Sequence, residues 1–405
     1  MSKSKKRLVP VRRFKEFENA DAWEQRKLGD IVSWKKGTGL TKAELNSNKT
    51  GNEVVHYADL YKFSPVIFNV IHWSKKSEGT IIPDNSLLFP MSDVTPLGLA
   101  RVSTIVRNGV RAGSDILIAT VDKKHTAQFL SYEINAQHKK IIPFVTGTTV
   151  RHINAGGLAK LNIMITSSKE QQKIGDFFKC LDKLITLHQH KLDKLKRVKS
   201  AYLTEMFPAE GEREPKRRFP GFTGAWELRK LGDFGKVAMN KRIFKNQTSE
   251  KGDVPFYKIG TFGGVADSYI SHDLFKEYKL KYPYPQKGDL LISASGSIGR
   301  VIEYEGKDEY FQDSNIVWLD HDNRLENSFL KQFYNIVKWQ GLEGSTIKRL
   351  YNKNILATKI TVPSISEQKK IGKFLNQLDS LVTLHQRKLD KLKKMKAAYL
   401  NEMFV

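Results

Sequence analysis

The sequence predicts a mixed α/β (α+β) fold, with two globular domains separated by a two-helix antiparallel coiled coil and related by a pseudo-two-fold internal repeat. Three observations support this prediction. At 405 residues the chain is long for one compact core. It contains two near-copies of one long basic helix. Each copy follows a region of short apolar runs broken by Gly, Asp and Asn, which is typical of strands and turns.

The charge and composition favour a nucleic-acid partner. Apolar residues make up 40% of the chain, so packed cores can form, and the formal net charge is +25. Such an excess of cations is typical of proteins that bind polyanions, although a lysine-rich surface that only maintains solubility would give the same count. The single cysteine, Cys180, excludes an internal disulfide. No apolar run approaches the roughly 18 residues of a membrane helix, so we expect a cytoplasmic protein with no membrane partner.

Two repeated segments divide the chain. AWEQRKLGD begins at Ala22 and AWELRKLGD begins at Ala225, and each opens a region that ends in the long helix. The segments between them, residues 31–146 and 234–343, share little sequence. We therefore predict, in order, a basic N-terminal segment (1–21), a first globular domain (22–166), a first long helix (167–207), a linker rich in Pro, Gly and charge (208–224), a second globular domain (225–363) and a second long helix (364–405).

The globular domains combine strand and helix patterns. Short apolar runs predict strands at Ser86–Pro90, Ile116–Thr120, Asp289–Ser293 and Ile316–Leu319. The stretch KGDLLISASGSIGRVIEYEG, from Lys287, predicts a strand, a Gly-Ser turn and a second strand, whereas Asn327–Trp339 has helical periodicity. The similar segments at the start and end of each half indicate parts that serve the same role twice. The dissimilar middle segments indicate two related but different binding functions.

The repeated helices are identical at 26 of 38 positions between Glu170–Phe207 and Glu367–Phe404. Their apolar and semi-polar residues alternate at spacings of four and three, which is the pattern of a coiled-coil seam. Each helix is about 57 Å long, and Ser168 and Ser366 are the predicted N-terminal caps. The central part of the predicted seam consists of Leu181, Ile185, His188, Leu192 and Leu195 in the first copy, and of Leu378, Val382, His385, Leu389 and Leu392 in the second.

Two such seams in one chain can bury each other. Two equivalent domain-and-helix units favour a two-fold arrangement, which requires antiparallel helices; a parallel pair, or pairing between two chains, is the competing arrangement. We expect His188 and His385 to set the register of the seam rather than to bind metal or act in catalysis. The two helices carry +8 of the net charge, so +17 lies elsewhere, and the main polyanion-binding surface is expected outside them.

The chain lacks the common motifs of catalysis. It has no GxxxxGK[ST] phosphate loop, no HExxH, no paired cysteines for zinc and no Asn/Asp-Pro-Pro-Tyr run of an amino-methyltransferase. GSIG at Gly296–Gly299 has the wrong spacing for a dinucleotide fingerprint and better fits a hairpin turn. We therefore predict a binding protein with no catalytic, cofactor or metal site of its own.

Several segments together resemble the specificity subunit of type I restriction-modification enzymes. They are AWExRKLGD in each half, KGDLLISASGSIGRV, GSTIKRL, and the exit segment that runs from SEQKKIGKFL to AAYLNEMF. The resemblance implies that two target-recognition domains each read one half of a bipartite sequence in double-stranded DNA. It implies that the helices space these domains and dock two modification (methyltransferase) subunits. S-adenosylmethionine, ATP and Mg would then be bound by those subunits and by the restriction subunits of the full complex.

The resemblance also indicates DNA-contacting residues, each of which could instead be a solvated surface cation or part of a structural turn. In the second domain they are Lys241, Arg242, Lys258, Thr261, Phe262, Ser293, Ser295, Ser297, Arg300, Lys348 and Arg349. In the first domain they are Lys35, Lys36, Thr148, Thr149, Arg151 and His152. The stretch LLFPMSDVTPLGLARV departs from the hairpin pattern of the second domain, so only Ser92, Asp93 and Thr95 are a possible counterpart there.

Two functions of other classes fit the same sequence. A stand-alone DNA methyltransferase or nuclease with its own target-recognition domain would show activity without a partner. A coiled-coil scaffold protein would show no binding to duplex DNA even with its partners present.

Overall fold

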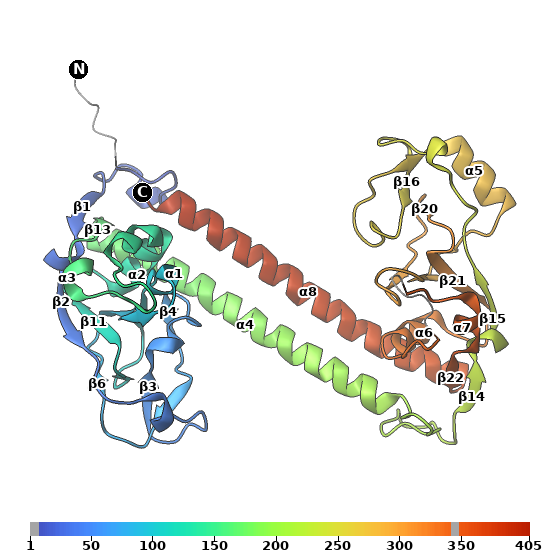
Figure 1. Cartoon of the computed structure of the whole chain (residues 1–405), viewed down its shortest axis with the longest axis horizontal. Coiled ribbons are helices and arrows are strands. Elements are labelled where there is room, and N and C mark those ends of the chain that lie inside the picture. Colours follow the sequence, from blue (N-terminus) through green and yellow to red (C-terminus); the bar gives the residue numbers. More distant parts are fainter. Residues whose placement is uncertain (1–7, 342–347) are drawn as a thin grey trace. The chain divides into compact units, whose positions relative to one another are not determined.

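The chain folds into two compact units in a computed structural model, which describes residues 8–341 and 348–405. Unit 1 takes in the chain up to His190 together with His385–Val405, and unit 2 is Lys191–Leu384. Each unit therefore contains one globular domain, the first part of the long helix that follows it and the last part of the other long helix (Figure 1). The start of the predicted N-terminal segment, and the GSTI portion of GSTIKRL, lie outside the described residues.

The domain of unit 1 is built on a five-stranded sheet of order β2-β11-β7-β9-β4. These strands are β2 (Val32–Lys36), β11 (Ile116–Val121), β7 (Ser86–Pro90), β9 (Ser103–Ile105) and β4 (Val66–Ile67). A second sheet has the order β5-β3-β10-β6, from β5 (His72–Ser74), β3 (Asn52–Val55), β10 (Arg111–Ala112) and β6 (Thr80–Ile81). Two-stranded pairs join β1 (Glu24–Lys27) to β13 (Asn162–Ile165) and β8 (Ser92–Asp93) to β12 (Arg151–His152). The helices are α1 (Pro96–Leu99), α2 (Ala127–Ala136) and α3 (Ala155–Leu158).

The domain of unit 2 repeats this plan with fewer strands. Its main sheet has the order β15-β21-β18-β19, from β15 (Gly235–Ala238), β21 (Ile316–His321), β18 (Leu290–Ser293) and β19 (Val301–Glu303). A smaller sheet joins β17 (Tyr269–Ile270), β16 (Val254–Tyr257) and β20 (Tyr310–Phe311), and β14 (Glu227–Lys230) pairs with β22 (Lys359–Val362). The helices are α5 (His272–Lys281), α6 (Asn327–Tyr334) and α7 (Asn352–Ala357).

The four strands predicted from apolar runs are present as β7, β11, β18 and β21. The Gly-Ser hairpin is also present, because β18 pairs antiparallel with β19 from Leu290 opposite Glu303 to Ile292 opposite Val301. The helix predicted over Asn327–Trp339 is shorter, since α6 ends at Tyr334 and is followed by Asn335, a weak helix former. The ring of Trp339 lies 5.6 Å from that of Tyr334.

The two long helices are α4 (Ser168–Met206) and α8 (Ile365–Met403), and they pack together in antiparallel register. In unit 1, Lys396 binds Asp182 and the Tyr399 ring lies 5.1 Å from that of Phe177. In unit 2, Lys199 binds Asp379, so residue numbers rise along one helix as they fall along the other. The predicted mixed α/β class with a two-helix antiparallel coiled coil is confirmed (Figure 1).

The predicted N-terminal caps of these helices are wrong by one residue in α4 and by two residues in α8. The hydroxyl of Ser167, not Ser168, accepts a hydrogen bond from the Glu170 amide, at 3.3 Å. Ser364, not Ser366, does the same for the Glu367 amide, at 3.4 Å. Each capping serine therefore lies three residues before a glutamate, which is the spacing that an N-cap requires.

The end of each long helix completes the core of the domain other than the one that directly precedes that helix: α8 ends in the core of unit 1, and α4 ends in the core of unit 2. Phe404, after α8, lies 6.0 Å from Trp23 and 5.6 Å from Phe129 in unit 1. Phe207, after α4, lies 6.1 Å from Trp226 and 5.1 Å from Phe329 in unit 2. All ten central seam residues are buried or half-buried. Burial of Phe404 and Phe207 stabilises the association of each helix end with the domain that it contacts.

Candidate nucleic-acid interface

The segment before each domain is fastened to a long helix by an ion pair whose glutamate is buried. Arg13 donates two hydrogen bonds to Glu170, at 2.6 and 2.7 Å, and Arg218 donates two to Glu367, at 2.7 and 2.8 Å. The side-chain hydrogen bond to Glu170 raises the pKa of Arg13, as that to Glu367 does for Arg218. Two-pronged arginine–carboxylate pairs fix orientation as well as charge, so these pairs hold the segment before each domain against the start of a long helix.

Arg13 and Arg218 are not among the residues predicted from the sequence. A third repeat in the sequence marks them: PVRRFKEF from Pro10 and PKRRFPGF from Pro215 share the pattern Pro-x-Arg-Arg-Phe-x-x-Phe. The first Phe of each motif lies edge-on to a Phe of the neighbouring helix: Phe14 lies 5.7 Å from Phe177, and Phe219 lies 5.8 Å from Phe374. The N-terminal segment and the linker therefore make equivalent contacts in the two units.

A glutamine and a glycine of each long helix contact a helix of the neighbouring domain, which is α2 after β11 in unit 1 and α6 after β21 in unit 2. Gln171 accepts the Thr126 amide at the start of α2, and Gln368 accepts the Glu326 amide at the start of α6. One turn later, Gly175 and Gly372 let those helices approach closely. A Cβ atom at Gly372 would lie 2.1 Å from the Ser328 hydroxyl.

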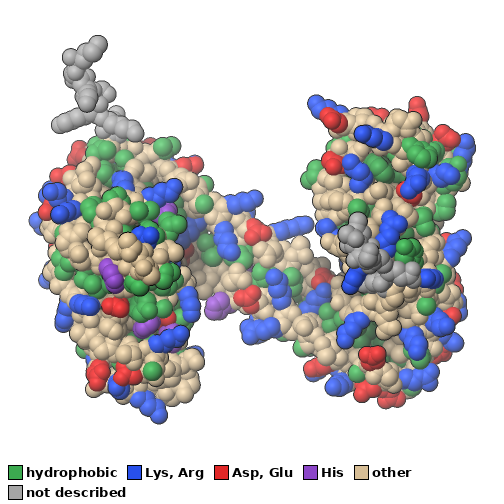
Figure 2. All heavy atoms as spheres, in the orientation of Figure 1, with side chains coloured by type: hydrophobic (Ala, Val, Ile, Leu, Met, Phe, Trp, Pro, Cys, Tyr) green, Lys and Arg blue, Asp and Glu red, His purple; other side chains and the backbone are tan. Residues whose placement is uncertain are grey.

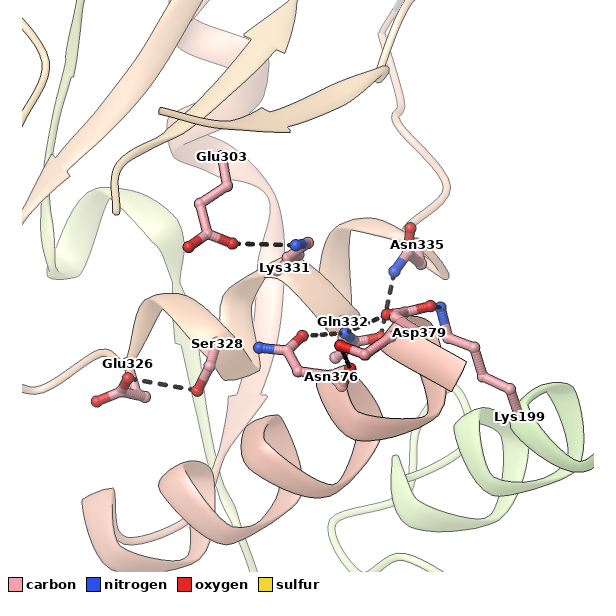
Figure 3. Close-up of polar contacts among 10 residues, drawn as sticks. Lys199, Glu303, Glu326, Ser328, Lys331, Gln332, Asn335, Asn376 and Asp379 are labelled. Carbon is pink, nitrogen blue, oxygen red and sulfur yellow. Dashed lines mark hydrogen bonds and ion pairs between the residues drawn. The ribbon is translucent and has the colours of Figure 1, made fainter. Parts of the chain in front are cut away.

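An aspartate completes each junction. In unit 2, Asp379 accepts hydrogen bonds from Lys199 at 2.5 Å and from Gln332 at 3.0 Å (Figure 3). In unit 1, Asp182 is bound by Lys396 and by the Tyr132 hydroxyl, the latter at 2.6 Å. Burial, followed by the charge and hydrogen bond of Asp182, raises the pKa of Tyr132. The repeated helices thus use identical residues to mount two domains of different sequence.

The predicted seam histidines meet in unit 1. The Nδ1 atoms of His188 and His385 lie 2.9 Å apart, and their rings are centred 5.1 Å from each other. This contact joins equivalent positions of the two repeats and is compatible with a role in register. Within residues 8–341 and 348–405, no three His, Cys, Asp or Glu side chains are grouped as a metal site would require.

In the first domain, most of the predicted DNA-contacting residues gather at one end of the five-stranded sheet. Lys36 ends β2, and its Nζ lies 3.9 Å from Asp115, which precedes β11. His152 pairs with Ser92 in the β12–β8 ladder, and its Nδ1 lies 3.0 Å from the Ser92 hydroxyl. Exposed residues of this group are Lys35, Lys36, Thr148, Thr149 and His152, whereas Arg151 is half-buried and donates to the Gly147 carbonyl.

In the second domain, the predicted residues lie at the equivalent sheet end. Ser295 follows β18 and forms an isolated bridge with Arg349. Arg300 donates to the Gly263 carbonyl at 3.1 Å and so joins the hairpin to the neighbouring loop. Exposed residues here are Lys241, Arg242, Ser297, Arg300 and Lys348, and half-buried ones are Lys258, Thr261 and Arg349.

Some predicted residues of the second domain have structural partners that restrict them. Phe262 is buried in the core, and buried Ser293 closes the hairpin by accepting the Arg300 amide at 2.9 Å. Arg242 is paired with Asp313 at 3.1 Å, and Lys258 with Asp267 at 2.9 Å. Ser295 is also buried, and its hydroxyl donates to Asn315 Oδ1 at 2.6 Å. We therefore propose no direct DNA contact for the side chains of Phe262, Ser293 and Ser295.

The uncertain correspondence between the two domains is resolved by backbone pairing. The Ile153 amide donates to the Met91 carbonyl, and the Leu350 amide donates to the Ala294 carbonyl. Ser92 therefore matches Ser295, and His152 matches Arg349. The departure LLFPMSDVTPLGLARV keeps this strand edge and inserts β8 and α1, where the second domain has a tight turn.

Positive side chains do not form one continuous patch on the face that Figure 2 shows; Lys and Arg are interspersed with Asp and Glu on both units. The net charge alone therefore does not locate the interface. The sheet ends are better candidates, because there hydroxyl, amide, imidazole and guanidinium groups converge on short loops, and these groups read base edges and phosphates.

Comparison with known proteins identifies the family. Residues 20–197 and 224–394 match the family described as the type I restriction modification DNA specificity domain. The chain belongs to this family. Specificity subunits are the non-catalytic members of type I restriction-modification systems.

Individual relatives agree with this assignment. A putative type I restriction enzyme specificity subunit of Haemophilus influenzae is 57% identical over 152 residues, which are 37% of this chain and 40% of that protein. A putative specificity subunit of Methanocaldococcus jannaschii is 28% identical over 200 residues, 44% of this chain and 45% of that protein. The matches thus span less than half the length of these curated relatives.

The fold also matches a solved structure. The crystal structure of a type I restriction-modification S subunit from M. genitalium superimposes with a TM-score of 0.68 over 98% of this chain and 99% of that one, at 17% sequence identity. This likeness concerns the fold alone. Among the described residues, no helix combines the length and apolar character needed to cross a lipid bilayer.

Proposed function

We propose that this chain selects the DNA target of a type I restriction-modification complex by reading a bipartite sequence, one half with each domain. The observation that carries the proposal is that the same helix residues hold both domains, whereas the polar loops at the ends of the two main sheets differ. The junction residues are the same in both units, whereas the loops at the sheet ends differ, as expected if two related modules read two different half-sites. Loop cations add affinity through phosphates.

Methylation-site mapping tests this function. DNA from cells that express the chain with its modification subunits should carry modified adenines in one bipartite sequence of two constant half-sites separated by a spacer of fixed length. Methylation by the purified chain alone would instead support the stand-alone enzyme. No binding to duplex DNA at low salt, even with the modification subunits present, would support the scaffold.

We further propose that each long helix docks one modification subunit through exposed leucines. Leu184 and Leu187 are 38% and 46% exposed, and Leu381 and Leu384, at the equivalent repeat positions, are 43% and 45% exposed. Each leucine immediately precedes a seam residue, so the pairs lie beside the seam and are not consumed by it. Nearby exposed lysines, such as Lys183 and Lys391, suit a partner with an apolar centre and an acidic rim.

Two double substitutions test the docking surfaces. L184E/L187E and L381E/L384E should each reduce the number of bound modification subunits from two to one, measured by mass photometry of the purified complex. The native Cys180, exposed one turn before Leu184, should be protected from maleimide when the complex forms. Unchanged stoichiometry in both variants would contradict the proposed surface. In this proposal S-adenosylmethionine, ATP and Mg bind the partner subunits, and the assembled complex works in the cytoplasm.

A further inference from the structure

An amide oxygen at the sheet end of the second domain joins the buried Ser295 to Arg349, a proposed DNA-contacting residue. Asn315 Oδ1 accepts a hydrogen bond from the Ser295 hydroxyl at 2.6 Å and another from Arg349 Nη2 at 2.8 Å. Ser295 belongs to the hairpin after β18, Asn315 precedes β21 and Arg349 precedes α7. One side chain therefore links three segments that are distant in sequence.

The backbone fixes where this amide lies. Ser314 has a φ of 54°, in the left-handed region that non-glycine residues seldom adopt. Main-chain hydrogen bonds then hold the turn: the Asn315 amide donates to the Asp313 carbonyl at 2.6 Å, and the Asn315 carbonyl accepts the Ala294 amide at 2.7 Å. A strained residue persists only when its surroundings hold it in place, and such residues cluster at binding sites.

The charge of Arg349 is oriented but not neutralised. Among the described residues no carboxylate pairs with Arg349, whereas Arg242 and Lys258 are paired with Asp313 and Asp267. An amide oxygen restricts the guanidinium plane without cancelling its charge, and most of its five N–H donors remain for a ligand. Half-buried Arg349 also has little freedom to search other orientations.

We propose that Asn315 positions Arg349 to read a guanine in the half-site of the second domain. A held guanidinium matches the O6 and N7 acceptors that guanine presents in the major groove, and this is the commonest specific arginine contact to DNA. Phosphate oxygens have the same acceptor chemistry, but contact with them carries no sequence information. This inference rests on the proposed function and names the base class that one half-site contains.

The first domain lacks this arrangement. His152 occupies the place of Arg349 and contacts the Ser92 hydroxyl. Asp115, a carboxylate, occupies the place of Asn315, because its carbonyl accepts the Met91 amide as the Asn315 carbonyl accepts the Ala294 amide. Asp115 is near Lys36 rather than a guanidinium. The guanine preference is therefore expected in one half-site only, which provides an internal control within the same DNA molecule.

Methylation mapping of variants tests the inference. The chain carrying R349K or N315D would be expressed with its modification subunits, and a randomised duplex library would be sequenced for methylated sites. R349K keeps the positive charge but loses the paired N–H donors of the guanidinium. N315D keeps the shape of the side chain but places a carboxylate beside Arg349, which neutralises its charge. Each should reduce the preference for guanine at one position of one half-site by about 10- to 100-fold, with the other half-site unchanged. S92A, at the first-domain position that matches Ser295, should leave that guanine preference intact.

Other outcomes separate the possible errors. If both variants keep the guanine preference, or if they weaken methylation equally across all sequences and lower the salt dependence as loss of one phosphate contact does, the base-reading assignment is overturned. If the unaltered chain yields no bipartite site, the proposed function fails and this inference fails with it. Thermal melting of R349K and N315D beside the unaltered chain identifies a variant that has lost its fold, and the other variant then decides.

Discussion

At the helix junctions the two units match almost residue for residue, and at the sheet ends they do not. Glu170, Gln171, Gly175 and Asp182 of α4 recur in α8. Each glutamate accepts from an arginine of the segment before the domain, and each glutamine and aspartate accepts a hydrogen bond from the domain itself. At the sheet ends, by contrast, the first domain has His152 at the position of Arg349 and Asp115 at the position of Asn315. Holding a domain to a shared helix pair requires one set of contacts, whereas reading two half-sites requires different chemistry in each.

The largest expected effect concerns the buried ion pairs. R13A and R218A each remove the arginine that pairs with a buried glutamate, which costs about 3–5 kcal/mol of unfolding free energy. The loss should be greater for R13A, because the Arg13 side chain is 5% exposed and that of Arg218 is 18% exposed. Denaturant-dependent hydrogen exchange, followed on peptides of each unit, would measure both losses separately.

R26A is the control for those variants, because Arg26 pairs with Glu24 on the surface and its loss should cost less than about 1 kcal/mol. A result in which R13A and R218A behave like R26A would show that the junction pairs do not fasten the domains.

The next effect distinguishes the two glycines. A Cβ atom at Gly372 would lie 2.1 Å from the Ser328 hydroxyl and 2.7 Å from its carbonyl carbon, whereas at Gly175 the nearest atom is the flexible Gln128 amide nitrogen, at 3.0 Å. G372A should therefore destabilise unit 2 by about 2 kcal/mol through overpacking, and G175A should destabilise unit 1 by less. Equal shifts in melting temperature for the two variants would show that the helix contact at Gly372 is no tighter than the one at Gly175.

The smallest effect is a pH dependence restricted to unit 1. Glu133 of α2 is buried, and burial raises its pKa to about 7, although the Met164 amide and Lys140 act in the opposite direction. The folded state therefore keeps a proton that the unfolded chain releases above about pH 4.5. The stability of unit 1 should fall as the pH rises from about 4.5 to 7 and then level off. At the equivalent position of α6, seven residues after the N-cap, unit 2 has Phe333.

Substitution by glutamine tests this dependence. E133Q can still accept the Met164 amide but does not ionise, so at pH 8 it should be more stable than the unaltered chain by about 1–2 kcal/mol. The gain should vanish at pH 4.5. Thermal melts of both proteins at the two pH values would measure this, and parallel pH profiles would show that Glu133 is not the cause.

Much of the fold was predictable because it depends on periodicity and repetition. The heptad spacing identified the seam from Leu181 to Leu195, and the apolar runs identified the central strands. The junction arginines were missed because Arg12–Arg13 and Arg217–Arg218 were read only as general positive charge, although the Phe residues that follow them repeat as well.

The details of the candidate interface were less predictable. Contacts such as Asn315 to Arg349 join residues 34 positions apart through a turn whose left-handed Ser314 has no sequence signature. Sequence spacing also did not show that Phe262, Ser293 and Ser295 are buried, because a residue at the end of a strand or in a short glycine-rich turn can point to either side of the sheet.

Exchange of one variable region tests the division of labour most directly. Residues 31–146 would be replaced by the corresponding region of another specificity subunit, the chimera expressed with its modification subunits, and the methylated sites mapped beside those of the unaltered chain. We predict that one half-site changes completely while the other half-site, with the guanine assigned to Arg349, stays the same. A change in both half-sites, or in neither, would contradict the proposal that each domain reads its own half of the target.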